Sequence, residues 1–201
     1  MVLFMNYRRN NKRFSVAGRG EYLSTSDFIV KYYTNLDVCR KFFFDMKWPT
    51  GYYCEKCGCT HYYFMKSKNC YRCAHCKHDE RLFTNTIFQD NKLPLNVLLY
   101  GLFLIFTSKK GISSLELSEE LKVNYKTACL LQTKARILMK NSNSKKSLDS
   151  SFYESDVAYT GAPSHNGKRG LGTDKQPFLV VLSTEQENKY PLYIKLHEIS
   201  S

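Results

Sequence analysis

The first twenty residues lack the apolar segment of a secretory signal, because they are polar and basic. We therefore expect no transfer to an oxidising compartment and no disulfides among the eight cysteines. A membrane-spanning segment is missing as well. The longest apolar run, residues 93–106, is too short to cross a bilayer and contains Asn96 and Gly101. These absences predict a cytoplasmic protein with no membrane partner.

Acidic residues are few relative to basic ones, with 18 Asp and Glu against 30 Lys and Arg. The resulting net charge of +12 favours a polyanionic partner, and nucleic acid is the commonest one inside a cell. A membrane surface is the competing explanation, but no predicted helix combines a basic face with an unbroken apolar one. A hydrophobic content of 43% over 201 residues is enough for one or two packed domains.

Two C-x-x-C pairs, fifteen residues apart, are the most specific motif: Cys54, Cys57, Cys73 and Cys76. Thiolates on two tight turns can complete a tetrahedron around Zn²⁺, and this spacing leaves room for a short hairpin. A redox C-x-x-C of the thioredoxin type would require a single pair within a βαβ unit. The pattern therefore predicts a zinc ribbon that is unfolded without its metal.

Other potential ligands lie near these pairs. Cys59 and Cys70 break the two-plus-two symmetry and are not expected to bind the ion. Gly58 follows the first pair, where glycine allows the turn that directs backbone amides at the sulfurs. The histidines of this region are expected to be solvated: His61, His75 and His78.

Apolar helices are predicted on both sides of the ribbon. Residues 34–46 carry an apolar stripe, and Thr34 with Asp37 can form a capping box at its start. Pro94 begins a second helix that runs to about Thr107 and is so rich in Leu and Phe that it must be buried.

A short helix, a tight turn and a longer helix are predicted next. Ser113 and Glu116 can cap the short helix, Val123 and Asn124 turn the chain, and the longer helix runs to about Lys140. This is helix-turn-helix architecture, in which the third helix enters the major groove by its N-terminal turn. The side chains expected to contact bases or phosphates are Tyr125, Lys126, Thr127, Gln132, Lys134, Arg136 and Lys140. A three-helix scaffold with a solvated charged face is the alternative.

The sequence periodicity changes after a polar linker, residues 143–151. Residues 152–159 alternate as a strand that places Glu154 and Asp156 on one face. Two further strands complete a predicted antiparallel meander: residues 178–183 and 190–196.

Five segments occur in a fixed order between about residues 35 and 183: KWPTGYYCEKCGC, YRCAHC, FTNTIFQDNKLPL, TSKKGISSLELSEELKVNYKTA and ESDVAYTGA. With these segments in this order, the chain resembles the zinc-ribbon DDE transposases of bacterial insertion sequences, the group related to Merlin elements. The resemblance implies that the ribbon and the helix-turn-helix bind the inverted repeats of the element. It also implies an RNase H-like domain that cuts and joins DNA, a nucleoid-associated location in a bacterium, and assembly of two or more copies.

The resemblance and the patterns together predict an α+β multidomain protein. Its expected parts are a basic arm (1–24), a zinc-ribbon domain with a flanking helix (25–90), a helix-turn-helix module (91–142), the linker (143–151) and the first three strands of an incomplete RNase H-like domain (152–201).

The resemblance places Asp156 where the first metal-binding aspartate belongs, with Glu154 as a group that supports the site. Such a carboxylate would help to bridge two Mg²⁺ or Mn²⁺ ions if the full catalytic domain were present. The chain departs from the family at Val157, where an acidic residue is usual, and stops at Ser201, before the second aspartate and the glutamate. We therefore expect a truncated transposase, inactive alone. The alternatives are a non-catalytic DNA-binding regulator and, as a further class, a zinc-ribbon protein that acts on RNA or ribosomes.

Overall fold

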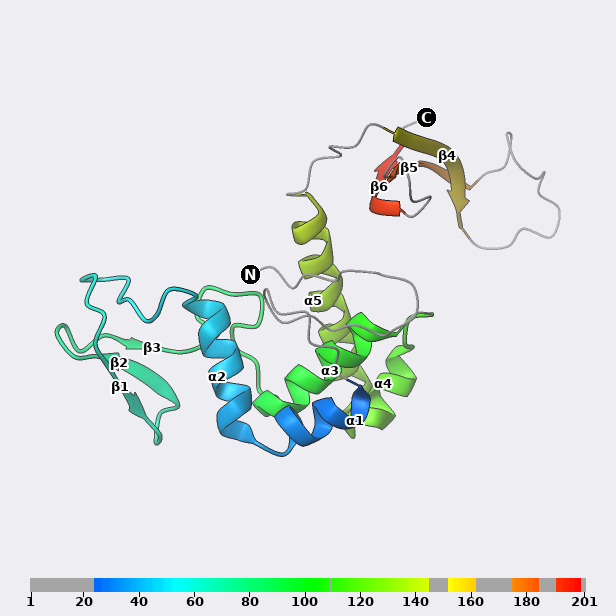
Figure 1. Ribbon diagram of the computed structural model, residues 1–201. Coiled ribbons are helices and arrows are strands. Elements are labelled where there is room, and N and C mark those ends of the chain that lie inside the picture. Colours follow the sequence, from blue (N-terminus) through cyan, green and yellow to red (C-terminus); the bar gives the residue numbers. More distant parts are fainter. Residues whose placement is uncertain (1–23, 109, 145–151, 162–174, 185–190, 200–201) are drawn as a thin grey trace. The chain divides into compact units, whose positions relative to one another are not determined.

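The described part of the chain forms two compact units (Figure 1). The computed structural model describes residues 24–108, 110–144, 152–161, 175–184 and 191–199. In these residues the first unit, 1–142, combines helices with a small antiparallel sheet, and the second, 143–201, contains another antiparallel sheet. This is the α+β composition predicted from the sequence. The predicted basic arm, apart from Ser24, and most of the predicted linker lie outside the described residues.

A short helical segment and a longer helix begin the first unit. Helix α1, Thr25–Phe28, starts with a reciprocal capping box between Ser24 and Asp27 and continues as a π-helical turn, η1, Ile29–Tyr33. Helix α2, Leu36–Lys47, confirms the helix predicted before the ribbon. It packs against η1, and both η1 and α2 also contact α3.

The cap of α2 differs from the prediction. The side-chain oxygen of Asn35 accepts hydrogen bonds from the backbone N–H groups of Asp37, at 3.1 Å, and Val38, at 3.2 Å. The hydroxyl of Thr34, the predicted cap, instead donates to the carbonyl of Val30 at 2.8 Å. Asn and Thr both cap helices well. Here Asn35 is the cap, because the hydroxyl of Thr34 is already bonded to the preceding helical turn.

The ribbon consists of three short antiparallel strands in the order β1-β2-β3: β1 Tyr62–Met65, β2 Cys70–Cys73 and β3 Asp79–Glu80. Strands β1 and β2 form the hairpin predicted between the two cysteine pairs. Arg72 and Asp79 lie opposite each other and form a two-pronged ion pair, with nitrogen–oxygen distances of 2.6 and 2.7 Å. The hydrogen bonds from Arg72 lower the pKa of Asp79. Because Arg72 is on β2 and Asp79 is on β3, the pair holds the two-residue strand β3 against the hairpin.

Three helices complete the first unit: α3 Leu95–Thr107, α4 Ser114–Leu121 and α5 Tyr125–Ser144. The hydroxyl of Ser113 accepts a hydrogen bond from the N–H of Glu116 at 3.1 Å and so caps α4 as predicted. Helix α4 ends at Lys122, whose left-handed conformation, φ 51°, turns the chain into α5. Helix α5 continues four residues beyond its predicted end at Lys140, so the start of the predicted linker is helical. Within the described ranges, every helix is too short or too polar to span a bilayer.

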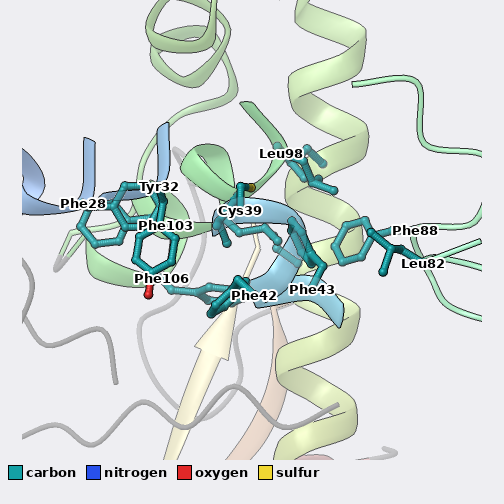
Figure 2. Close-up of a cluster of buried hydrophobic side chains, with 14 of the residues drawn as sticks. Phe28, Tyr32, Cys39, Phe42, Phe43, Leu82, Phe88, Leu98, Phe103 and Phe106 are labelled. Atoms are coloured by element: carbon teal, nitrogen blue, oxygen red, sulfur yellow. The ribbon is translucent and has the colours of Figure 1, made fainter. Parts of the chain in front are cut away.

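One cluster of buried side chains joins the ribbon to the helices in the described part of the first unit. Figure 2 shows Phe28, Tyr32 and Phe103 grouped on one side of this cluster, and the rings of Phe28 and Phe103 stack with their centroids 4.2 Å apart. Phe43 and Phe88 lie on the other side (Figure 2). Ribbon and helices therefore share a core.

The second unit contains, among its described residues, a three-stranded antiparallel sheet: β4 Phe152–Thr160, β5 Gln176–Thr184 and β6 Pro191–Glu198. The strand order β4-β5-β6 confirms the predicted meander. Glu154 lies opposite Leu182 and Asp156 opposite Val180, so the two carboxylates share a face of the sheet with apolar neighbours.

Two leucines of α4 test this packing. Leu117 is 0% exposed and Leu115 is 60% exposed, although both are leucines of the same short helix. We expect Leu117→Ala to lower the free energy of unfolding by about 2–5 kcal/mol because it leaves a cavity, and Leu115→Ala to change it by less than about 0.5 kcal/mol. Urea denaturation measures both values, and equal losses would contradict the described orientation of α4.

Candidate metal centre and nucleic-acid interface

The four predicted zinc ligands come together. The sulfur atoms of Cys54, Cys57, Cys73 and Cys76 all lie within 4.8 Å of one another, and the Cys54–Cys76 and Cys57–Cys73 distances are both 3.5 Å. Sulfur atoms about 2.3 Å from a tetrahedral Zn²⁺ would lie about 3.8 Å apart. Four thiols at this spacing fit a structural zinc site. Among the described residues, this is the one group of at least three Cys, His or carboxylate side chains close enough to hold a metal, and it does not include Cys59 or Cys70.

Each cysteine pair is followed by a residue in the left-handed conformation. Gly58 has φ 70° and donates its N–H to the carbonyl of Cys54 at 2.8 Å, in agreement with its predicted role. Lys77 takes the equivalent position after the second pair, with φ 60°. This second turn was not predicted at Lys77, because lysine rarely adopts that conformation and carries no local signal of it.

Backbone N–H groups and neighbouring thiols shift the acidity of the cluster. Burial alone would raise the pKa of Cys73, but the N–H groups of Cys76 and His75 and the thiols of Cys57 and Cys76 lower it to about 6. For Cys57 the N–H of Cys59 lowers the pKa, but burial and hydrogen bonds with the other three thiols raise it to about 12. Without a cation, the cluster thus favours the thiolate form of Cys73 and the protonated form of Cys57. The charge of Zn²⁺ would stabilise all four as thiolates.

A buried ion pair joins the end of α2 to β3. The ammonium of Lys47 lies 2.7 Å from the carboxylate of Glu80, donates to the carbonyl of Arg81 at 2.7 Å and lies 4.8 Å from the centroid of the Trp48 ring. Glu80 is 1% exposed. Breaking such a pair leaves a charge buried without its partner, at a cost of about 3–5 kcal/mol. The contact joins residues distant in sequence, and no local pattern predicted it.

Helix α5 exposes most of the side chains predicted to contact DNA. Tyr125, Lys126, Arg136 and Lys140 are exposed. Thr127 and Lys134 are half-buried, and the ammonium of Lys134 lies 5.9 Å from the centroid of the Phe88 ring. These positions leave a cationic surface along the helix.

Gln132 is placed differently from the other predicted contacts. It is 4% exposed, and its amide nitrogen donates to the carbonyl of Ile112 at 2.6 Å. Its amide oxygen accepts a hydrogen bond from the hydroxyl of Ser114 at 2.8 Å. Gln132 therefore connects α5 to the start of α4 and has no free amide to offer a base, so we leave it out of the proposed interface.

The carboxylates of β4 do not complete a two-metal site with the described residues. Glu154 and Asp156 are both exposed, and one carboxylate oxygen of Asp156 accepts a hydrogen bond from the N–H of Val157 at 2.8 Å. Their partners across the sheet, Leu182 and Val180, offer no ligand atoms. The described residues of this sheet do not fit a pair of Mg²⁺ ions, and we derive no catalytic step from them.

Comparison with known proteins identifies one segment. Residues 35–79 match the family model of the transposase zinc-ribbon domain of the IS1595 family. No curated protein and no solved structure matched the chain. The matched segment holds all four clustered cysteines, and it confirms the predicted resemblance to a transposase zinc ribbon over those residues.

Replacing one clustered cysteine should remove the metal. We expect Cys73→Ser to lose bound zinc and to lower the melting temperature, because three thiolates hold Zn²⁺ far less tightly than four. Cys59→Ser is the matched control, since Cys59 lies in the ribbon but outside the cluster. Elemental analysis and thermal denaturation measure both effects. Unchanged zinc content in Cys73→Ser would overturn the ligand assignment.

Acid should also release zinc from the cluster. Because Zn²⁺ binds thiolates rather than thiols, protons compete with the ion for all four sulfur atoms as the pH falls. We expect zinc content and melting temperature to fall together between about pH 8 and pH 5. A chelator at about pH 8 should give the same metal-free state. Full retention of zinc at the acid end would contradict the prediction.

Proposed function

We propose that this chain is a zinc-containing, DNA-binding protein of the transposase type that recognises the inverted repeats of an insertion sequence. The observation that carries the proposal is the matched ribbon, residues 35–79, sharing one core with a helix whose outer surface is cationic. A net charge of +12 agrees with a polyanionic partner. Assembly of two copies on paired DNA ends is part of the same proposal.

Helices α4 and α5 would serve as a helix-turn-helix. Both helices contribute to the same buried cluster, with Leu117 and Leu121 from α4 and Ala128 and Leu131 from α5. The side chain of Asn124 begins α5 by accepting a hydrogen bond from the N–H of Lys126 at 2.9 Å. This packing leaves the N-terminal turns of α5 exposed, as a helix that enters the major groove requires.

Cations along α5 would hold the phosphate backbone on both sides of the groove. Lys126 lies in the first turn, where the helix dipole also favours an anion, and Arg136 and Lys140 lie about three and about four turns further on. Contacts of this kind fix the position of a helix on DNA and make binding sensitive to salt.

Asp156 would supply one carboxylate of a DDE site in this proposal, with Glu154 beside it. The second candidate function is a non-catalytic DNA-binding regulator with the same ribbon and helices. The apolar partners of both carboxylates on β5, Leu182 and Val180, favour this candidate, because in the described sheet β5 supplies no metal ligand opposite Glu154 or Asp156. Both candidates require the same DNA interface.

Charge removal on α5 tests that interface. We expect Lys126→Ala and Arg136→Ala each to weaken binding to a duplex carrying the inverted repeats that flank the gene, and to reduce the slope of log affinity against log salt by about 1. Lys126 is exposed, so Lys126→Ala should leave the melting temperature unchanged. Arg136 is exposed too but donates a long hydrogen bond, 3.4 Å, to the side-chain oxygen of Gln132, so we expect Arg136→Ala to lower the melting temperature only slightly. Lys41→Ala, an exposed lysine on α2, is the control for loss of charge alone.

Gel shifts at several salt concentrations measure these affinities. Equal weakening by Lys41→Ala would show that net charge, rather than α5, determines binding. Equal affinity for unrelated RNA would contradict the proposal itself.

A further inference from the structure

The outer face of α5 carries exposed apolar side chains between its cations. Lys126, Cys129, Leu130 and Thr133 follow the spacing i, i+3, i+4, i+7, which places them on one side of a helix, and Ile137 continues the row one turn later. Leu130 is 56% exposed and Ile137 is 42% exposed. Helices that read the major groove contact bases from positions with this spacing. We call these five residues the outer row of α5.

Polar side chains near this row are engaged within α5 or in the core. The hydroxyl of Thr133 donates to the carbonyl of Cys129 at 2.9 Å, so its proton is not available to a base. A hydrogen bond with the thiol of Cys129 raises the pKa of Tyr125, which shows that the phenol group also has a partner on the helix. Gln132, whose amide could have read adenine, is buried. The outer row therefore offers a base mainly apolar contact.

The surrounding charges restrict what can cover these apolar groups. Lys126, Lys134, Arg136 and Lys140 all lie on the same helix, so packing two copies of α5 face to face would bring like charges together. A polyanion with apolar groups would satisfy both features. Duplex DNA has this chemistry, because phosphates border a major groove in which thymine alone presents a methyl group.

We propose that Leu130 and Ile137 read thymine methyl groups in the major groove. This inference rests on the proposed function and adds the chemistry of base recognition. Seven residues of helix separate the two side chains by about 10 Å along the helix axis, and a helix that follows the major groove passes about two base-pair steps over this distance. The bound site should therefore contain two thymine positions about two base pairs apart.

Deoxyuridine tests the contact, because it lacks only the methyl group of thymidine and keeps every hydrogen-bonding atom. The probe is a duplex that the full chain selects from a random-sequence pool, synthesised with thymidine or with deoxyuridine. We expect the wild-type protein to bind the deoxyuridine duplex about fourfold more weakly for each methyl group that the protein no longer covers. Leu130→Ala should bind the thymidine duplex more weakly and show less of this discrimination. Ile137→Ala gives an independent measurement at the second position.

Leu36→Ala is the matched control, since Leu36 is 49% exposed at the start of α2 and lies off the outer row. It should keep the wild-type ratio of the two affinities, and circular dichroism should show all three variants folded. Equal wild-type affinity for the two duplexes would overturn the inference while leaving DNA binding intact. Failure to bind or select any duplex would instead overturn the proposed function.

Discussion

Convergence of four sulfur atoms within 4.8 Å is the constraint on which the ribbon depends. Its strands have only four, four and two residues, too few to form an independently stable sheet. A bound structural zinc can contribute on the order of 10 kcal/mol to a module of this size. Aromatic packing adds to it: the ring centroids of Tyr71 on β2 and Trp48 at the end of α2 lie 5.3 Å apart. Zinc binding and packing against the shared core would therefore both stabilise the ribbon.

Surface chemistry on α5 depends on a polar contact inside the protein. Gln132 bonds to Ile112 and Ser114, which fixes the rotation of α5 about its axis relative to the start of α4. The same rotation buries Ala128 and Ala135 and turns Leu130 outward. A sequence interpretation that assigns Gln132 to DNA therefore mistakes a residue that positions the helix for one that contacts the ligand.

Features determined by local spacing were predictable from the sequence. The cysteine spacing predicted the ribbon and its hairpin, and the alternation of residues 152–159 predicted β4 with Glu154 and Asp156 on one face. Two kinds of feature were not predictable: those for which neighbouring residues compete for one role, and those that depend on contacts between residues distant in sequence. Asn35 caps α2 instead of Thr34, because the hydroxyl of Thr34 donates to the carbonyl of Val30. Lys77 adopts a left-handed conformation that its residue type does not indicate.

The ion pair between Lys47 and Glu80 also bears on how the ribbon is positioned relative to the helices. This buried pair joins α2 to β3, and the core that the ribbon shares with the helices includes Ala128 and Leu131 of α5. If the ribbon and α5 both contact one duplex, their footprints must keep a constant distance and a constant phase around the DNA axis. The protein would then select a site by the bases within the two contacted segments and also by the number of base pairs between those segments.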